Sequence, residues 1–113
     1  MNNQLLNRLE GLNARFEEVS TLITDPAVIA DMKRFVKLNK EYSDLEKILS
    51  KRDEYRRVLN NIEEAKTILN TENDPDLREM AKIELEDLEP RVEPLEEDIK
   101  ILLIPADPED SKN

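Results

Sequence analysis

The side chains best suited to bind another molecule are five cations that lie within one short stretch of the sequence. We call them the basic cluster: Lys47, Lys51, Arg52, Arg56 and Arg57. On a helix, residues three or four apart lie on neighbouring ridges, so Lys51, Arg52 and Arg56 could contact successive RNA phosphates. We favour a structural interpretation, in which these cations balance an acidic helix that lies antiparallel beside them.

A run of three carboxylates, Glu96, Glu97 and Asp98, is the other candidate set of ligands. Carboxylate oxygens suit hard divalent cations such as Mg²⁺ and Ca²⁺. A run of charges is more often the solvated face of a helix, and that is the interpretation we adopt. We therefore expect no metal site here.

Most catalytic chemistry is excluded by the residues that the sequence lacks. It has no Cys, no His and a single Gly in 113 residues. Disulfides, thiolate nucleophiles, Cys/His zinc sites and the usual proton shuttle are ruled out. One glycine cannot build a P-loop or a dinucleotide-binding loop. We expect no catalytic residues and no cofactor.

The negative charges of the chain are concentrated in its second part. Residues 1–70 carry 12 basic and 12 acidic side chains, whereas residues 71–113 carry 5 basic and 15 acidic ones, which accounts for the net charge of −10. Such a surface repels nucleic acid and anionic membrane. It is a solvated acidic face or a site for a basic protein partner, and we favour the former. Without a signal peptide or a long apolar run, a cytoplasmic protein is expected.

Apolar spacing predicts three helical segments. The first runs to residue 23 with Asn2 or Asn3 as its N-cap, and it includes Gly11. Asp25 and Pro26 then fit the N-cap and first position of a new helix. Either a short helix covers 26–30 and a second begins near Asp31, or one helix runs through. The apolar stripe of the long helix contains Phe35, Leu38, Tyr42, Leu45, Ile48, Tyr55, Leu59, Ile62 and Leu69.

Two cations, Arg52 and Lys66, also fall on that stripe, where it should widen or open to water. Asp74 and Pro75 repeat the cap pattern and begin a third helix, which Pro105 ends. Its apolar residues alternate spacings of four and three: Ala81, Leu85, Leu88, Val92, Leu95, Ile99 and Leu102.

Because this seam keeps its phase across Pro90 and Pro94, we expect a kinked helix, or two helices abutting near Glu89, rather than a loop. The predicted fold is all-α: an elongated antiparallel hairpin of two long helices with an N-terminal helix packed alongside. Its apolar seams are narrow, so modest stability is expected.

Three stretches together resemble the bacterial class I peptide chain release factors, in particular the release factor 1 type. They are DPAVIADMKRFVKLNKEYSDLEKIL, NDPDLREMAKIELEDLEP and ILLIPADPEDSKN, and the resemblance covers essentially the whole chain. The resemblance implies a helical N-terminal domain over 1–105 and, over 106–113, the start of a connection to a central domain. The Gly-Gly-Gln motif of the family has no counterpart here, because the only glycine is Gly11.

The resemblance also implies a function. The full-length family directs translation termination at the stop codons UAA and UAG, and this part helps to position the factor on the ribosome. The expected partners are the factor-binding side of the ribosome, its stalk-base proteins, rRNA through the basic cluster, and the remainder of the factor, but no membrane and no DNA. The alternative is a free-standing helical coiled-coil adaptor or chaperone.

Overall fold

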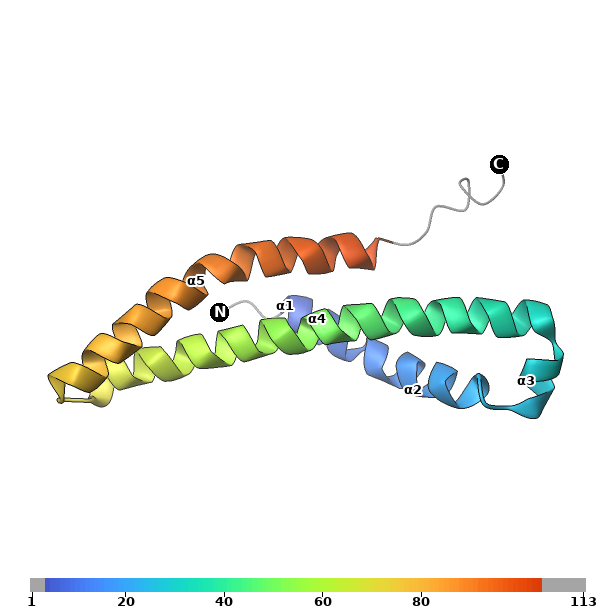
Figure 1. The fold of residues 1–113 in the computed structure, drawn as a ribbon, viewed down its shortest axis with the longest axis horizontal. Helices are drawn as coiled ribbons and strands as arrows, with labels where there is room; N and C mark the ends of the chain where they lie inside the picture. The colour runs from blue at the N-terminus through green and yellow to red at the C-terminus, as the bar shows by residue number, and fades with distance from the viewer. Residues whose placement is uncertain (1–3, 105–113) are drawn as a thin grey trace.

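The computed structural model describes residues 4–104 as an elongated assembly of helices. This range contains five α-helices and no strand. The longest, α4 (Met32–Thr71), is a single helix of 40 residues, so it measures about 60 Å. The principal extents of the molecule are 63 × 31 × 19 Å, and α4 therefore runs along its whole length. The predicted all-α elongated hairpin is confirmed, with α5 (Pro75–Leu103) as its second long arm (Figure 1).

The first predicted helix is two helices in the structure. These are α1 (Gln4–Glu10) and α2 (Leu12–Leu22), with Gly11 between them. The backbone of Gly11 stays near helical values (φ −64, ψ −17), and its N–H donates to the carbonyl of Asn7 at 3.3 Å. Glycine is the weakest helix former after proline, which explains an interruption at this residue. The Asn2 or Asn3 cap lies outside the described residues.

Of the two alternatives left open at residues 26–31, the structure has the short helix. It is α3 (Pro26–Ala30), and it ends where α4 begins. The side chain of Asp25 accepts a hydrogen bond from the N–H of Ala27 at 2.9 Å, and that of Asp31 accepts one from the N–H of Arg34 at 3.3 Å. Both aspartates have extended backbones, so each ends one segment and caps the next.

The turn between the two long helices is held from both sides. Asp74 caps α5 by accepting from the N–H of Asp76 at 2.9 Å. The guanidinium of Arg78 donates to the carbonyls of Leu69 and Glu72 at the end of α4. A cation there satisfies unpaired carbonyls and complements the negative end of the helix dipole.

The third predicted helix is one continuous helix, α5, that contains both Pro90 and Pro94. Both prolines are exposed, so the carbonyls that lose a partner can bond to water. Figure 1 shows that α5 changes direction in the middle of its length. A proline ring pushes against the carbonyl four residues earlier and bends a helix away from the proline side. Prolines on the outer side therefore bend α5 back toward α4. The predicted end at Pro105 lies outside the described residues.

Two apolar clusters lie along α4. One joins α1, the second half of α4 and α5, and contains Leu9, Tyr55, Ile62, Leu88, Leu95 and Ile99 among others. The other joins α2, α3 and the first half of α4 around Val19, Val28, Leu38 and Leu45. Within it, the rings of Phe16 and Tyr42 stack with their centroids 5.1 Å apart.

The two cations on the apolar stripe of α4 differ. Lys66 is exposed, as predicted. Of the two alternatives stated for Arg52, a wider stripe or an opening to water, the opening is excluded, because Arg52 is only 9% exposed. Its aliphatic stem can pack among apolar neighbours while its guanidinium finds acidic partners.

Candidate functional site

The structure divides the basic cluster into cations that are neutralised within the fold and cations that are not. Arg52 and Arg56 belong to the first group. Each places a guanidinium nitrogen 3.1 Å from the same carboxylate oxygen of Glu10, on α1. Each also lies close to Asp53, at 2.9 Å for Arg52 and 3.4 Å for Arg56. A further hydrogen bond joins Arg52 to the side-chain oxygen of Asn13 at 3.0 Å.

Through these contacts, Arg52 and Arg56 hold two helices of the fold together. The Glu10 carboxylate lies between them and ties the junction of α1 and α2 to the middle of α4. A guanidinium as enclosed as that of Arg52 is poorly placed to reach a phosphate. Charge balance within the fold, which the sequence suggested, therefore holds for these two residues, but their acidic partner is on α1 rather than on the third predicted helix.

Of the other three members of the basic cluster, Lys51 is half-buried and also has acidic partners within the fold. Lys51 lies 3.5 Å from Glu54 and 3.8 Å from Asp98 on α5, so one of its partners is on the helix expected from the sequence. Lys47 and Arg57 are exposed, and neither forms an ion pair within residues 4–104. The five cations thus lie on one stretch of α4, but acidic side chains of the fold neutralise the positive charge of several of them.

The three carboxylates of the acidic run have separate partners. Glu96 accepts a hydrogen bond from the hydroxyl of Tyr55 at 2.7 Å, Glu97 lies 3.5 Å from Lys100, and Asp98 lies near Lys51. Burial, together with the Glu96 carboxylate, raises the pKa of Tyr55 to about 12, so its hydroxyl remains a donor at neutral pH. Over the described part of the chain, no group of three or more acidic, His or Cys side chains is arranged to hold a metal ion.

A second internal ion pair fixes α2 to α4. The guanidinium of Arg15 donates to both carboxylate oxygens of Glu41, at 2.5 and 2.7 Å, and to Glu18 at 2.6 Å. The hydrogen bonds from Arg15 lower the pKa of Glu41. Sequence reasoning did not find this pair, because 26 residues separate its members.

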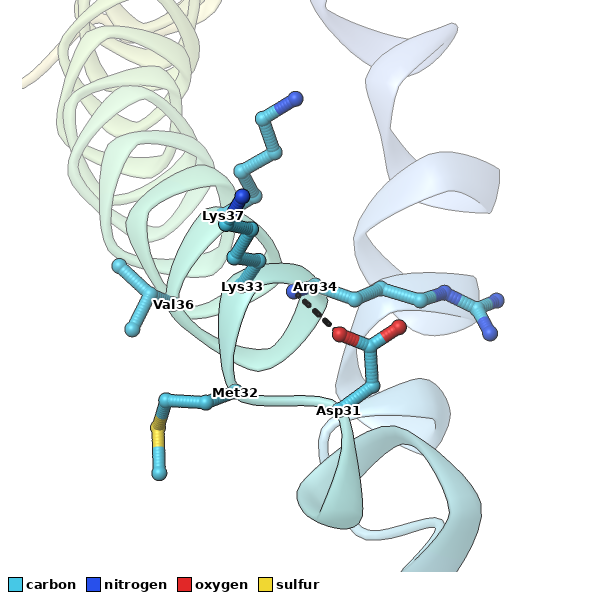
Figure 2. A pocket seen from close by; sticks show the side chains of 6 residues that line it. All are labelled: Asp31, Met32, Lys33, Arg34, Val36 and Lys37. Atoms are coloured by element: carbon cyan, nitrogen blue, oxygen red, sulfur yellow. Dashed lines mark hydrogen bonds between the residues drawn. The ribbon is translucent and has the colours of Figure 1, made fainter.

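Sequence reasoning also missed the exposed surface at the beginning of α4. Its side chains line a shallow hollow, and we call it the α4 tip surface: Asp31, Met32, Lys33, Arg34, Val36 and Lys37. Met32 is 65% exposed and Val36 is 58% exposed. Figure 2 shows these two apolar side chains on one side of α4 and Arg34 on the other.

The charges of the α4 tip surface oppose the dipole of the helix. Lys33 and Arg34 lie in the first turn of α4, which contains no acidic residue. The N-terminal end of a helix is positive, so cations there are unfavourable by roughly 0.3–1 kcal/mol each. Two cations in the first turn of a predicted helix were the sequence feature that could have revealed the α4 tip surface, because departures from the usual charge pattern are expected at functional surfaces.

No helix in the described range is both long enough and apolar enough to cross a membrane.

Comparison with known proteins places the chain in a family. The PCRF domain family matches residues 12–113. A protein named peptide chain release factor 1 from Parabacteroides distasonis is 67% identical over 98% of this chain and 30% of its own length. Proteins of the same name from Bacteroides thetaiotaomicron and Cytophaga hutchinsonii are 61% and 50% identical over 99% and 96% of the chain, again over 30% of their own lengths. No solved structure shows significant similarity to the chain.

The chain thus spans about 30% of the length of these relatives. The resemblance seen in three stretches of the sequence is confirmed by these matches. Since the family matches all but the first 11 residues, the chain belongs to the PCRF domain family.

Proposed function

We propose that this chain is the helical N-terminal domain of a peptide chain release factor of the release factor 1 type, and that it positions the factor on the ribosome during translation termination. The observation that carries this proposal is the family match over residues 12–113, together with 67% identity to a protein named for that function. Residues 1–105 form the domain, and 106–113 begin the connection to the next one.

In this proposal the chain itself is not catalytic and works in the cytoplasm. Hydrolysis of peptidyl-tRNA and recognition of UAA and UAG belong to other parts of the factor, because this sequence has one glycine and no Gly-Gly-Gln. What the chain contributes is shape. A helix of 40 residues, fixed by α1 and α2 on one side and by α5 on another, is a stiff arm suited to orienting what is attached to it.

Two surfaces are available for contact with the ribosome. One consists of Lys47 and Arg57, which are exposed, together with the half-buried Lys51 beside them. The other is the α4 tip surface, whose exposed Met32 and Val36 suit a protein contact and whose cations suit phosphates. The acidic residues of α5 make that helix an unfavourable surface for bare rRNA.

Removal of residues 1–105 from the full-length factor tests the positioning role. The half-saturating concentration of the factor in a stop-codon-dependent peptide release assay should rise by about ten-fold or more, since binding is weakened. The rate at saturating factor should change little, because the reacting groups lie elsewhere. An unchanged half-saturating concentration would contradict the positioning role.

A reading frame that stops after the codon for Asn113 would instead favour the free-standing adaptor.

The RNA contact is tested by the triple variant Lys47→Glu, Lys51→Glu, Arg57→Glu. Its matched control reverses Lys66 and Lys82, which are exposed on the other half of the hairpin. Only the triple variant should weaken ribosome binding, and its salt dependence should become shallower as phosphate contacts are lost.

A further inference from the structure

The first turns of α5 carry apolar side chains that no helix of the fold covers. Leu77, Met80 and Ile83 are 43%, 65% and 56% exposed. Their spacing of three places them along one ridge of the helix. Exposed apolar side chains that are rimmed by charged ones are typical of a protein contact. We define the α5 ridge as these three residues together with the acidic residues among and beside them: Asp76, Glu79 and Glu84.

The charge of the α5 ridge is negative and is not neutralised within the fold. Its three carboxylates are exposed, and none forms an ion pair with any of residues 4–104. Of the cations nearby, Arg78 donates to backbone carbonyls at the end of α4, and Arg91 is paired with Asp87 at 3.0 Å. Lys82 follows Met80 by two residues, so it lies on the opposite side of the helix. The α5 ridge is therefore both apolar and acidic.

The α4 tip surface is equally apolar and has the opposite charge. Met32 and Val36 are 65% and 58% exposed. Lys33 and Lys37 each follow one of them in the sequence. Because residues three and four apart are neighbours on a helix surface, the two apolar side chains and the two lysines form adjoining rows. Neither lysine forms an ion pair with any of residues 4–104.

The acidic residues closest to these lysines along α4 are engaged elsewhere. Asp31 caps the helix by accepting from the N–H of Arg34. The next two acidic residues, Glu41 and Asp44, are paired with Arg15 and Lys40 respectively. The positive charge of the α4 tip surface is therefore available to a partner from outside the molecule.

The α4 tip surface and the α5 ridge lie at opposite ends of the molecule. One is formed by the first residues of α4, whereas α5 begins just after the last residue of α4, Thr71. Figure 1 shows the start of α4 and the start of α5 at the two ends of the fold. Because α4 measures about 60 Å, these complementary surfaces cannot meet within one molecule. They can meet between two copies of the chain.

We propose that the α4 tip surface of one copy of this chain docks on the α5 ridge of a second copy, in a head-to-tail contact. Met32 and Val36 then pack on the apolar side chains of the ridge, while Lys33 and Lys37 face its carboxylates. Each surface extends along only about 8–9 Å of helix, so the contact is small, weak and sensitive to salt. It does not depend on the function proposed above.

Sedimentation equilibrium of the 113-residue chain tests for this contact. A chain that does not associate has a mass of 13.2 kDa at every concentration. At low salt we expect the weight-average mass to rise as the concentration approaches about 1 mM, the range of a weak contact. At about 1 M salt, where the Debye length is about 3 Å, the association should weaken several-fold. Backbone amide signals that shift with concentration should belong to the first turns of α4 and of α5.

Charge reversal identifies the two surfaces. The tip variant carries Lys33→Glu and Lys37→Glu, and the ridge variant carries Glu79→Lys and Glu84→Lys. Each variant alone should remain monomeric, because like charges then face each other. An equimolar mixture of the two should associate again, because the unchanged tip surface of the ridge variant fits the unchanged ridge of the tip variant.

Two further variants serve as controls. Arg8→Glu with Arg57→Glu changes as many charges as the tip variant at exposed positions away from both surfaces, and it should associate like the wild-type chain. Met80→Ser changes no charge and should weaken association several-fold, because Met80 is 65% exposed in the free chain and covered in the contact. Circular dichroism should show equal helix content in all variants, which separates loss of the contact from loss of the fold.

Three results would overturn the proposal. The first is a mass of 13.2 kDa for the wild-type chain at every concentration. The second is a tip variant or a ridge variant that associates as strongly as the wild-type chain. The third is a mixture of these two variants that stays monomeric although the wild-type chain associates.

Discussion

At the scale of single residues, internal ion pairs take up the charges that first suggest a binding site. Arg52 is placed among apolar side chains by its position on the stripe of α4, and it is satisfied by Glu10, Asp53 and Asn13. A cation that is 9% exposed needs such partners, because an unpaired buried charge is costly. The sequence pattern places Arg52 correctly on the stripe. Its partner could not be found from the pattern, since 42 residues separate Arg52 from Glu10.

The variant Glu10→Gln tests the tie between α1 and α4. It removes the negative charge shared by Arg52 and Arg56 and should lower the free energy of unfolding by about 1 kcal/mol, measured by urea denaturation. Glu17→Gln is the matched control, because Glu17 is exposed and its carboxylate has no partner within residues 4–104. Equal stabilities of the two variants would mean that the Glu10 pair contributes nothing.

The Arg15–Glu41 pair makes part of the stability depend on pH. The pKa of Glu41 is lower in the folded chain than its ordinary value of 4.5, so its contribution is fully present above about pH 4.5 and is lost as the pH falls through the folded pKa. Glu41→Gln should therefore be less stable than the wild-type chain near neutral pH. The difference should shrink as the pH falls toward about 3, measured by urea unfolding at several pH values. A difference that is constant with pH would exclude this linkage.

At the scale of elements, each Asp-Pro or Asp-containing turn ends one helix and begins the next. Two of the three caps, Asp25 and Asp74, could be predicted from the sequence because proline follows each of them. Asp31 has no such signal, and the sequence left two alternatives there. The side chain of Asp31 decides between them by capping α4 at Arg34. The division at Gly11 was not predicted, since apolar spacing continues through it.

Loss of the Asp31 cap should destabilise the start of α4. Asp31→Ala should cost about 1 kcal/mol, because the N–H of Arg34 loses its acceptor, whereas Asp31→Asn should retain most of the stability. Hydrogen exchange should quicken at the first turn of α4 in the alanine variant alone. Equal exchange in both variants would show that the cap is dispensable.

The bend of α5 illustrates how a local rule can be broken without loss of the element. Two interior prolines would ordinarily end a helix. Because both lie on the exposed side, their effect is to curve α5 around the cluster formed by Leu88, Leu95 and Ile99. The seam predicted this continuity, since its phase is maintained across both prolines. The direction of the bend follows from which side is exposed, which requires the packed structure.

At the scale of the whole molecule, α4 contributes buried side chains to both apolar clusters, one in each half of its length. Leu12 of α2 also packs against both clusters, but α4 supplies more of their buried side chains than any other helix of residues 4–104. The integrity of the molecule therefore depends on the unbroken middle of α4. The periodicity of apolar residues predicted this long helix. The division of the core into two clusters could not be predicted, because it depends on the packing of α2 and α3 against the first half of α4 and of α1 and α5 against the second half.

Ser50→Pro tests the dependence on α4, since Ser50 is an exposed residue near the middle of the helix. The variant should lose about 3 kcal/mol or more of the free energy of unfolding, because proline removes a hydrogen bond and clashes with the preceding turn. Ser50→Ala, which keeps the helix, should be within about 0.5 kcal/mol of the wild-type chain. A proline variant with full stability would show that the two clusters do not need a continuous α4.

A single helix that runs the length of the molecule also has a mechanical consequence. Rotation of a rod about one end moves the other end in proportion to its length. For a rod of about 60 Å, a tilt of about 10° at the end of α4 near α5 displaces the Met32 end by about 10 Å, the width of a helix. A small change of angle at the end of α4 near α5 is thus amplified into a large displacement of the Met32 end, as in a lever.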